Sequence, residues 1–165
     1  MLVGEQTAFL DALARDWADA LTDYAWRFLA YQPHRLADAQ DAVQETFLRY
    51  MKKAPRLNGP EHERAWLLTV AGNICRNQLR QRRTHPHTPL DSLPEIPAPS
   101  VADTPLLDRL TALPDRVKMV VLLHYVEGYK VREIAQRLHL TQSTVKMRLQ
   151  KGRQLLKQAI KEEDL

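Results

Sequence analysis

The stretch TQSTVKMRLQKGRQLLKQAIK, residues 141–161, combines two features that decide the fold of the second half of the chain. Val145, Leu149, Leu156 and Ile160 recur at intervals that place them on one side of an α-helix. The same stretch contains six Lys or Arg residues and no Asp or Glu. An ordinary solvated helix face mixes charges of both signs, so a purely cationic face indicates a polyanionic ligand.

The charge of the chain is distributed in blocks. The 165 residues are 44% hydrophobic, with a net charge of +4 and a pI of about 9.3. Basic residues outnumber acidic ones by nine to two in 49–83 and by twelve to seven in 106–165. Residues 84–105 contain three acidic residues and no basic one. Two cationic blocks separated by an anionic spacer indicate two contacts with one polyanion.

Several classes of protein are disfavoured by composition. Cys75 is the single cysteine, so no intrachain disulfide can form and a reducing cytoplasm is expected. Residues 1–21 lack the basic and apolar regions of a signal peptide, and no apolar run approaches the ~18 residues of a membrane span. The six histidines include no HExxH spacing. We therefore expect no membrane insertion, no metal or cofactor, and no enzymatic activity.

Helical periodicity dominates and strand patterns are nearly absent, so we predict an all-α protein. Asp38 is the expected N-cap of a helix in which Ala39, Val43, Phe47 and Met51 recur every fourth residue as a buried stripe. Proline and glycine separate this helix from its neighbours. The first half of the chain thus predicts three helices, over residues 5–31, 38–54 and 63–83.

A proline-rich segment separates the two halves. Six of the ten prolines lie in 84–105. Each proline removes an amide donor and restricts the residue before it, so we predict a flexible, partly extended linker that contains the domain boundary. The predicted organisation is two small helical domains, over residues 1–83 and 106–165, joined by this linker.

The second half predicts a helix-turn-helix. Thr104 and Pro105 form an expected helix start, Pro114 begins the next helix and Gly128 supplies its left-handed stop. The stretch VREIAQRLHL (131–140) predicts a short helix, and a three-residue break separates it from the basic helix of the stretch 141–161, which has Thr141 or Ser143 as its cap. Packing of its apolar side leaves several side chains for solvent or for the major groove of DNA, which admits one helix: Gln142, Lys146, Met147, Gln150, Lys151 and Arg153.

Two further helix faces carry unusual patterns. In the third helix, polar side chains form one stripe whose amides and guanidinium groups suit base edges and phosphates: Thr69, Asn73, Arg76, Asn77 and Arg80. In the second helix, Leu48 is an apolar residue within a polar face that also contains Asp41, Gln44, Glu45 and Lys52. The alternatives remain open at this point: a basic end on an ordinary amphipathic helix, and a single exposed leucine of no special role.

Together these segments resemble a known family. DAQDAVQETFLRYM (38–51) followed by AWLLTVAGNICRNQLRQRR (65–83) resembles region two of bacterial RNA polymerase sigma factors of the extracytoplasmic-function (ECF) group. LPDRVKMVVLLHYVEGYKVREIAQRLHLTQSTVKMRLQKGRQLLK (113–157) resembles their region four. The resemblance covers nearly the whole chain except the linker. It implies an alternative sigma factor that binds core RNA polymerase and directs promoter-specific transcription initiation.

The resemblance also implies residue roles, carried over by position. Binding to the beta-prime clamp coiled coil of core polymerase falls on Asp41, Gln44, Glu45 and Leu48. Recognition and melting of the minus-ten element fall on Leu57, Val70, Ala71, Asn73, Arg76, Asn77 and Arg80, with Arg82 and Arg83 also along the DNA backbone. Recognition of the minus-thirty-five element falls on Lys146, Arg148, Lys151 and Arg153. Met147 and Gly152 stand where the family commonly has a small hydroxyl residue and an alanine.

The partners implied are core RNA polymerase, promoter DNA and an anti-sigma factor, with no cofactor and a cytoplasmic location. The alternative function is a free-standing helix-turn-helix transcriptional regulator that acts without polymerase. Such a regulator would bind specific duplexes through the C-terminal half and would have no use for residues 41–48.

Overall fold

The computed structural model describes residues 3–30, 32–53, 55–84, 109 and 113–163. In these ranges every regular element is a helix, which confirms the predicted all-α class. The chain divides into two compact units, residues 1–100 and 101–165, and each is described by itself. The linker predicted after residue 84 and the helix start predicted at Thr104 and Pro105 lie outside the described residues. No helix in the described part is long and apolar enough to cross a membrane.

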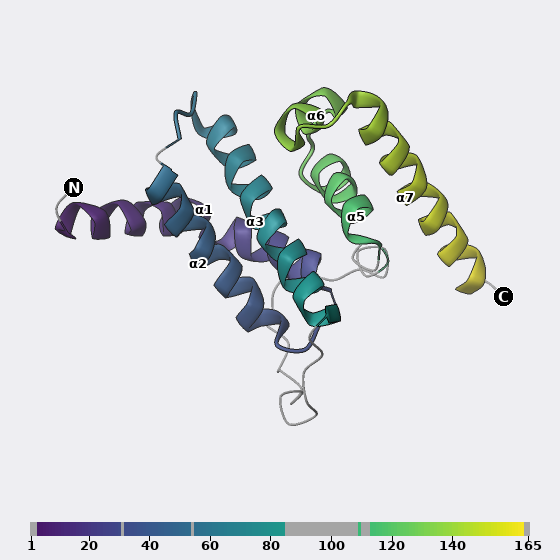
Figure 1. Cartoon of the computed structure of the whole chain (residues 1–165), viewed down its shortest axis with the longest axis horizontal. Coiled ribbons are helices and arrows are strands. Elements are labelled where there is room, and N and C mark those ends of the chain that lie inside the picture. Colours follow the sequence, from purple (N-terminus) through teal and green to yellow (C-terminus); the bar gives the residue numbers. More distant parts are fainter. Residues whose placement is uncertain (1–2, 31, 54, 85–108, 110–112, 164–165) are drawn as a thin grey trace. The chain divides into compact units, whose positions relative to one another are not determined.

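The described residues of the first unit form three long helices: α1 (Val3–Leu29), α2 (Arg35–Lys53) and α3 (Pro60–Thr84). Each packs against the other two, with α2 and α3 side by side in Figure 1. Pro60 begins α3 three residues before the predicted start, because proline at the first helical position gives up no needed amide and already has a helical φ. The core consists of large side chains at or below 2% exposure, among them Leu21, Tyr24, Phe28, Leu67 and Leu68.

A single carboxylate joins the three helices. Trp17 Nε1 of α1 donates a hydrogen bond to Glu63 Oε1 over 2.6 Å, and the Tyr50 hydroxyl of α2 donates to Glu63 Oε2 over 2.7 Å. The Tyr50 ring lies 5.5 Å from Phe9 and meets Trp66 edge-on at 5.3 Å, measured between ring centroids. Burial, together with the hydrogen bond to Glu63, raises the pKa of Tyr50 to about 12.

The start of α2 differs from the prediction. The helix begins at Arg35, and Asp38 is already inside it, so Asp38 as N-cap was wrong. Arg35 fixes the helix start, because its Nε donates to the Trp26 carbonyl over 2.7 Å and its guanidinium lies 4.0 Å from the Trp26 ring centroid. The Asp38 carboxylate instead pairs with Arg82 of α3, which also donates to the Pro33 carbonyl over 2.7 Å.

The second unit has the predicted helix-turn-helix. Helix α5 (Asp115–Val121) continues directly into a π-helix, η2 (Leu122–Val126), and Gly128 follows with φ of +84°, which confirms the left-handed stop. Helix α6 (Val131–Leu138) and helix α7 (Gln142–Glu163) are separated by the predicted three residues. Thr141 is the cap, since its Oγ1 accepts a hydrogen bond from the Thr144 amide over 3.1 Å.

Helix α7 packs closely on α5 because it has a glycine at the contact. A Cβ at position 152 would lie 2.6 Å from Val121 Cγ2 and 3.2 Å from Val117 Cγ1. The packing against Val121 and Val117 therefore explains why this chain has a glycine at position 152, where the resemblance leads us to expect an alanine. Val145 and Leu149 of α7 are buried at 0% and 2% exposure, as predicted, whereas Leu156 is half-buried and Ile160 is exposed.

We predict that Gly152→Ala destabilises the second unit, because the added methyl group overlaps Val121. The overlap should cost about 1–3 kcal/mol, partly offset by the higher helix propensity of alanine, about 1 kcal/mol. Thermal unfolding of the full-length chain and amide hydrogen exchange in α5 and α7 measure the effect. The exposed Gln154→Ala serves as control. Val121→Ala should couple with Gly152→Ala, and strictly additive effects would contradict the overlap.

A second prediction concerns alkaline pH. The folded state holds the Tyr50 proton more tightly than the unfolded chain, whose tyrosine has a pKa of about 10. This stabilisation is fully present below pH ~10 and is lost as pH rises towards 12. Between those values, the denaturant midpoint should fall more steeply for the wild type than for Tyr50→Phe. Equal slopes for the two proteins would rule out the coupling.

Candidate functional site

The exposed face of α2 carries the predicted polymerase-binding residues. All four are exposed, and their spacing places them on one face of the helix: Asp41, Gln44, Glu45 and Leu48. Leu48 has 45% of its surface exposed, although the opposite face of the same helix is buried. Arg49 Nε donates to Glu45 Oε1 over 3.1 Å. The structure thus brings the four predicted residues together on one accessible surface.

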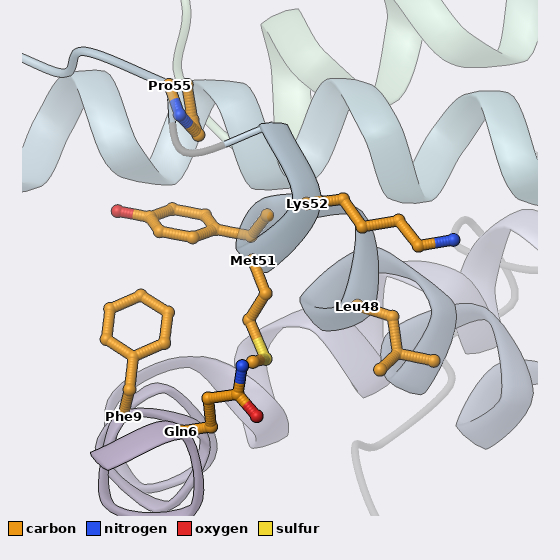
Figure 2. A pocket seen from close by; sticks show the side chains of 7 residues that line it. Gln6, Phe9, Leu48, Met51, Lys52 and Pro55 are labelled. Carbon is orange, nitrogen blue, oxygen red and sulfur yellow. The ribbon is translucent and has the colours of Figure 1, made fainter. Parts of the chain in front are cut away.

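A hollow lies beside Leu48, at the end of α2 (Figure 2). Its volume is about 590 Å³. In Figure 2, Met51 of α2 points towards Gln6 of α1, and Leu48 and Lys52 extend from the same part of α2 at the edge of the hollow. The hollow is mostly apolar and extends the exposed surface around Leu48 towards α1; the residues lining it are Gln6, Phe9, Leu48, Tyr50, Met51, Lys52 and Pro55.

The loop between α2 and α3 is fixed by a side chain of α3. The backbone N–H of Asn58 donates a hydrogen bond to His62 Nδ1 over 2.9 Å. Gly59 has φ of +94°, a conformation that favours glycine. Leu57, the residue of this loop that is predicted to contact the minus-ten element, directly precedes Asn58 and is half-buried. The sequence analysis did not predict this role of His62.

Helix α3 presents most of the predicted polar stripe. Asn73, Asn77 and Arg80 are exposed and Arg76 is half-buried. Arg80 donates to Asn77 Oδ1 over 3.1 Å, which joins the two side chains on the surface. Thr69, also in the stripe, donates its hydroxyl to the backbone carbonyl of residue 65 over 2.8 Å.

Three of the residues suggested for this DNA surface have different surroundings. Val70 is half-buried, and Ala71 is fully buried at 0% exposure. The Ala71 side chain packs in the core of the first unit. Arg82 is held by Asp38 and the Pro33 carbonyl, so its guanidinium serves the fold rather than an open surface.

Helix α7 carries the third set. Lys146, Lys151 and Arg153 are exposed, and Arg148 is half-buried. Arg153 donates to the Tyr125 hydroxyl over 2.9 Å, so a residue of η2 holds this guanidinium. Tyr125 is 49% exposed, and its ring meets His124 edge-on.

Sequence reasoning missed Tyr125, although a pattern pointed to it. Val117, Val121 and Tyr125 recur every fourth residue, and the two valines face Gly152 of α7. The third member of such a stripe is expected to reach the same helix. Its hydroxyl meets Arg153, one residue after the glycine, at the exposed end of the contact.

Among the described residues, no group of three or more His, Cys, Asp or Glu side chains could hold a metal ion. Cys75 is buried and forms no disulfide. The described residues present an α2 face with an exposed leucine, an α3 stripe of amides and guanidinium groups, and a cationic helix-turn-helix.

Each of the two units matches a protein-family model. The model of sigma-70 region 2 matches residues 13–85, and the model of sigma-70 region 4 matches residues 104–156. Together they cover the helices that carry the three surfaces.

Individual proteins agree with the family models. The chain is 32% identical over 148 residues to the ECF RNA polymerase sigma factor SigL of Mycobacterium tuberculosis, covering 84% of this chain and 83% of SigL. It is 30% identical over 134 residues to a probable RNA polymerase sigma factor, RfaY, of Xanthomonas campestris pv. campestris. That match covers 72% of this chain but only 33% of RfaY.

A solved structure has the same fold. The sigma factor RpoE of Bartonella quintana, in complex with the anti-sigma factor NepR, superposes with a TM-score of 0.66 at 21% identity. The match covers 93% of this chain and 97% of RpoE. The two region models and the similarity to SigL lead to one conclusion: the chain belongs to the ECF group of sigma-70 family RNA polymerase sigma factors.

Proposed function

We propose that this ECF sigma factor uses three surfaces, one for core RNA polymerase and two for promoter DNA. The observation that carries the proposal is the position of the polar side chains in each unit. The residues expected to bind polymerase or DNA are mostly exposed, and the apolar residues of the same helices are buried. Each surface therefore remains available after the unit has folded.

The exposed face of α2 is the proposed polymerase surface. An apolar side chain surrounded by hydrogen-bonding groups matches the anatomy of a protein interface, with a small apolar centre and a polar rim. Leu48 supplies the centre, and Asp41, Gln44 and Glu45 supply the rim. The chemistry suits a helical partner with basic and apolar residues, such as a coiled coil of the polymerase clamp.

The exposed part of the α3 stripe is the proposed minus-ten surface. Asn73, Asn77 and Arg80 are on one helix face, with Arg76 next to them, and amides can bond to base edges while guanidinium groups attract phosphates. Leu57 and Val70, both half-buried, would contact an unstacked base. A cationic groove with base contacts is how proteins hold single strands, so this surface can stabilise the melted promoter.

Helix α7 is the proposed recognition helix for the minus-thirty-five element. In a helix-turn-helix the second helix enters the major groove. Lys146 and Lys151 are exposed on this helix, five residues apart, and the Tyr125 hydroxyl accepts a hydrogen bond from Arg153. Arg148 would contact the DNA backbone from its half-buried position.

The chemistry of initiation then needs no reaction on this chain. Binding energy from two promoter contacts would favour the open duplex, and core polymerase would form the phosphodiester bonds in the cytoplasm. RpoE of Bartonella quintana is held by an anti-sigma factor, and we propose a partner of this kind here as well. A free-standing regulator would leave the exposed Leu48 face without a use, so the sigma factor role fits the whole chain better.

The polymerase surface can be tested with a double variant. Gln44→Ala/Leu48→Ala should weaken binding to core polymerase by about 2 kcal/mol or more if these residues form the centre of the interface. Run-off transcription in vitro should fall accordingly. Asp16→Ala/Asp19→Ala, both on the exposed side of α1, is the control and should behave as wild type. Wild-type affinity of the Gln44→Ala/Leu48→Ala protein would exclude this face.

The promoter surface can be tested on α7. Lys151→Ala should weaken promoter binding by ~1–3 kcal/mol and relax the preference at one base pair if Lys151 contacts a base. Holoenzyme affinities for a panel of minus-thirty-five variants measure both effects. Lys157→Ala, exposed further along the same helix, should keep the wild-type preference. An equal loss on every sequence would leave Lys151 only a phosphate contact.

A further inference from the structure

The largest exposed fraction among the big apolar side chains of the described residues belongs to Met147, at 62%. Single exposed apolar residues are common, so exposure alone carries little meaning. The position of Met147 is more informative. Val145 and Leu149, its neighbours two residues before and after, are buried at the contact with the rest of the second unit.

Helix geometry turns Met147 directly away from that contact. Two residues correspond to about 200° around an α-helix, so Met147 points almost opposite to both Val145 and Leu149. Lys146, Gln150 and Lys151 are its exposed neighbours, one residue or one turn away. Met147 is therefore the apolar centre of the cationic face that enters the major groove in the proposed function.

The ligand can be identified from the chemistry of that groove. The edges of the base pairs present hydrogen-bond donors and acceptors, and the one apolar group among them is the C5-methyl of thymine. Methionine is unbranched and polarisable, so it can adapt its shape to a methyl group. A protein partner would need a wider apolar patch, whereas Met147 is surrounded by cations and an amide.

We propose that Met147 binds the C5-methyl group of a thymine in the minus-thirty-five element and thereby sets the promoter preference of this sigma factor. The inference rests on the proposed function of α7 and adds the base that it selects. A serine at this position could not cover a methyl group in the same way, because its side chain is shorter and ends in a hydroxyl. The amide of Gln150 and the ammonium groups of Lys146 and Lys151 would contact neighbouring bases and phosphates.

The test removes only the methyl group. Promoters are first selected from a library with a randomised minus-thirty-five region, using the chain assembled with core polymerase. Each thymine of the selected element, on either strand, is then replaced in turn by deoxyuridine, which keeps base pairing and all hydrogen-bonding groups. For wild type, one replacement should weaken binding about four-fold, the value of one buried methyl group.

Two variants complete the test. Met147→Ser should bind thymine and uracil equally at that position, since its side chain no longer reaches the methyl group. Ile160→Ser removes another exposed apolar side chain of α7, nearer the C-terminal end, and should retain the four-fold difference. The inference is overturned if no replacement affects the wild type, or if Met147→Ser retains the difference.

The experiment separates failure of the Met147 contact from failure of α7 as the recognition helix. If the selected promoters show a minus-thirty-five preference but no methyl effect, α7 reads DNA without this contact by Met147. If the selection yields no minus-thirty-five preference at all, both the recognition role of α7 and the methyl contact are refuted. Selection of an element with a thymine that is sensitive to its methyl group in wild type, but not in Met147→Ser, supports both.

Discussion

Every helix of this chain has to bury one apolar stripe, and this constraint decides where its charged side chains lie. A short helix has little stability of its own in water, so most of its stability comes from packing. In α7, burial of Val145 and Leu149 turns Lys146, Met147 and Lys151 outwards. The binding surfaces are thus a consequence of core packing, because a helix buried on one side has only one side left for a ligand.

Polar contacts inside the first unit refine this arrangement. Glu63 receives hydrogen bonds from Trp17 and Tyr50, so one carboxylate fixes α1 and α2 against the start of α3. At the other end of α3, Arg82 pairs with Asp38. Between these two fixed ends, Asn73, Asn77 and Arg80 stay exposed. A rigid helix holds these side chains at constant spacing, which suits recognition of a strand of DNA.

In the second unit, a close approach of two helical elements is tied to a polar contact at the surface. Gly152 allows Val121 and Val117 to contact the α7 backbone, and the same approach lets Tyr125 reach Arg153. An alanine at position 152 would move the two elements apart or force the valines to shift. The residue at this buried contact therefore helps to place a cation on the surface next to it.

The sequence by itself determined the helical class, the helix-turn-helix with its three-residue break, and the α2 and α7 faces, because periodic apolar residues fix which side of a helix is buried. The start of α2, the burial of Ala71 and the use of Arg82 were decided only by the tertiary structure. Each depends on contacts outside the helix that contains the residue or on core packing: Trp26 holds Arg35, Ala71 lies in the core, and Asp38 binds Arg82. Local patterns describe one helix at a time, whereas these features arise where two or three helices meet.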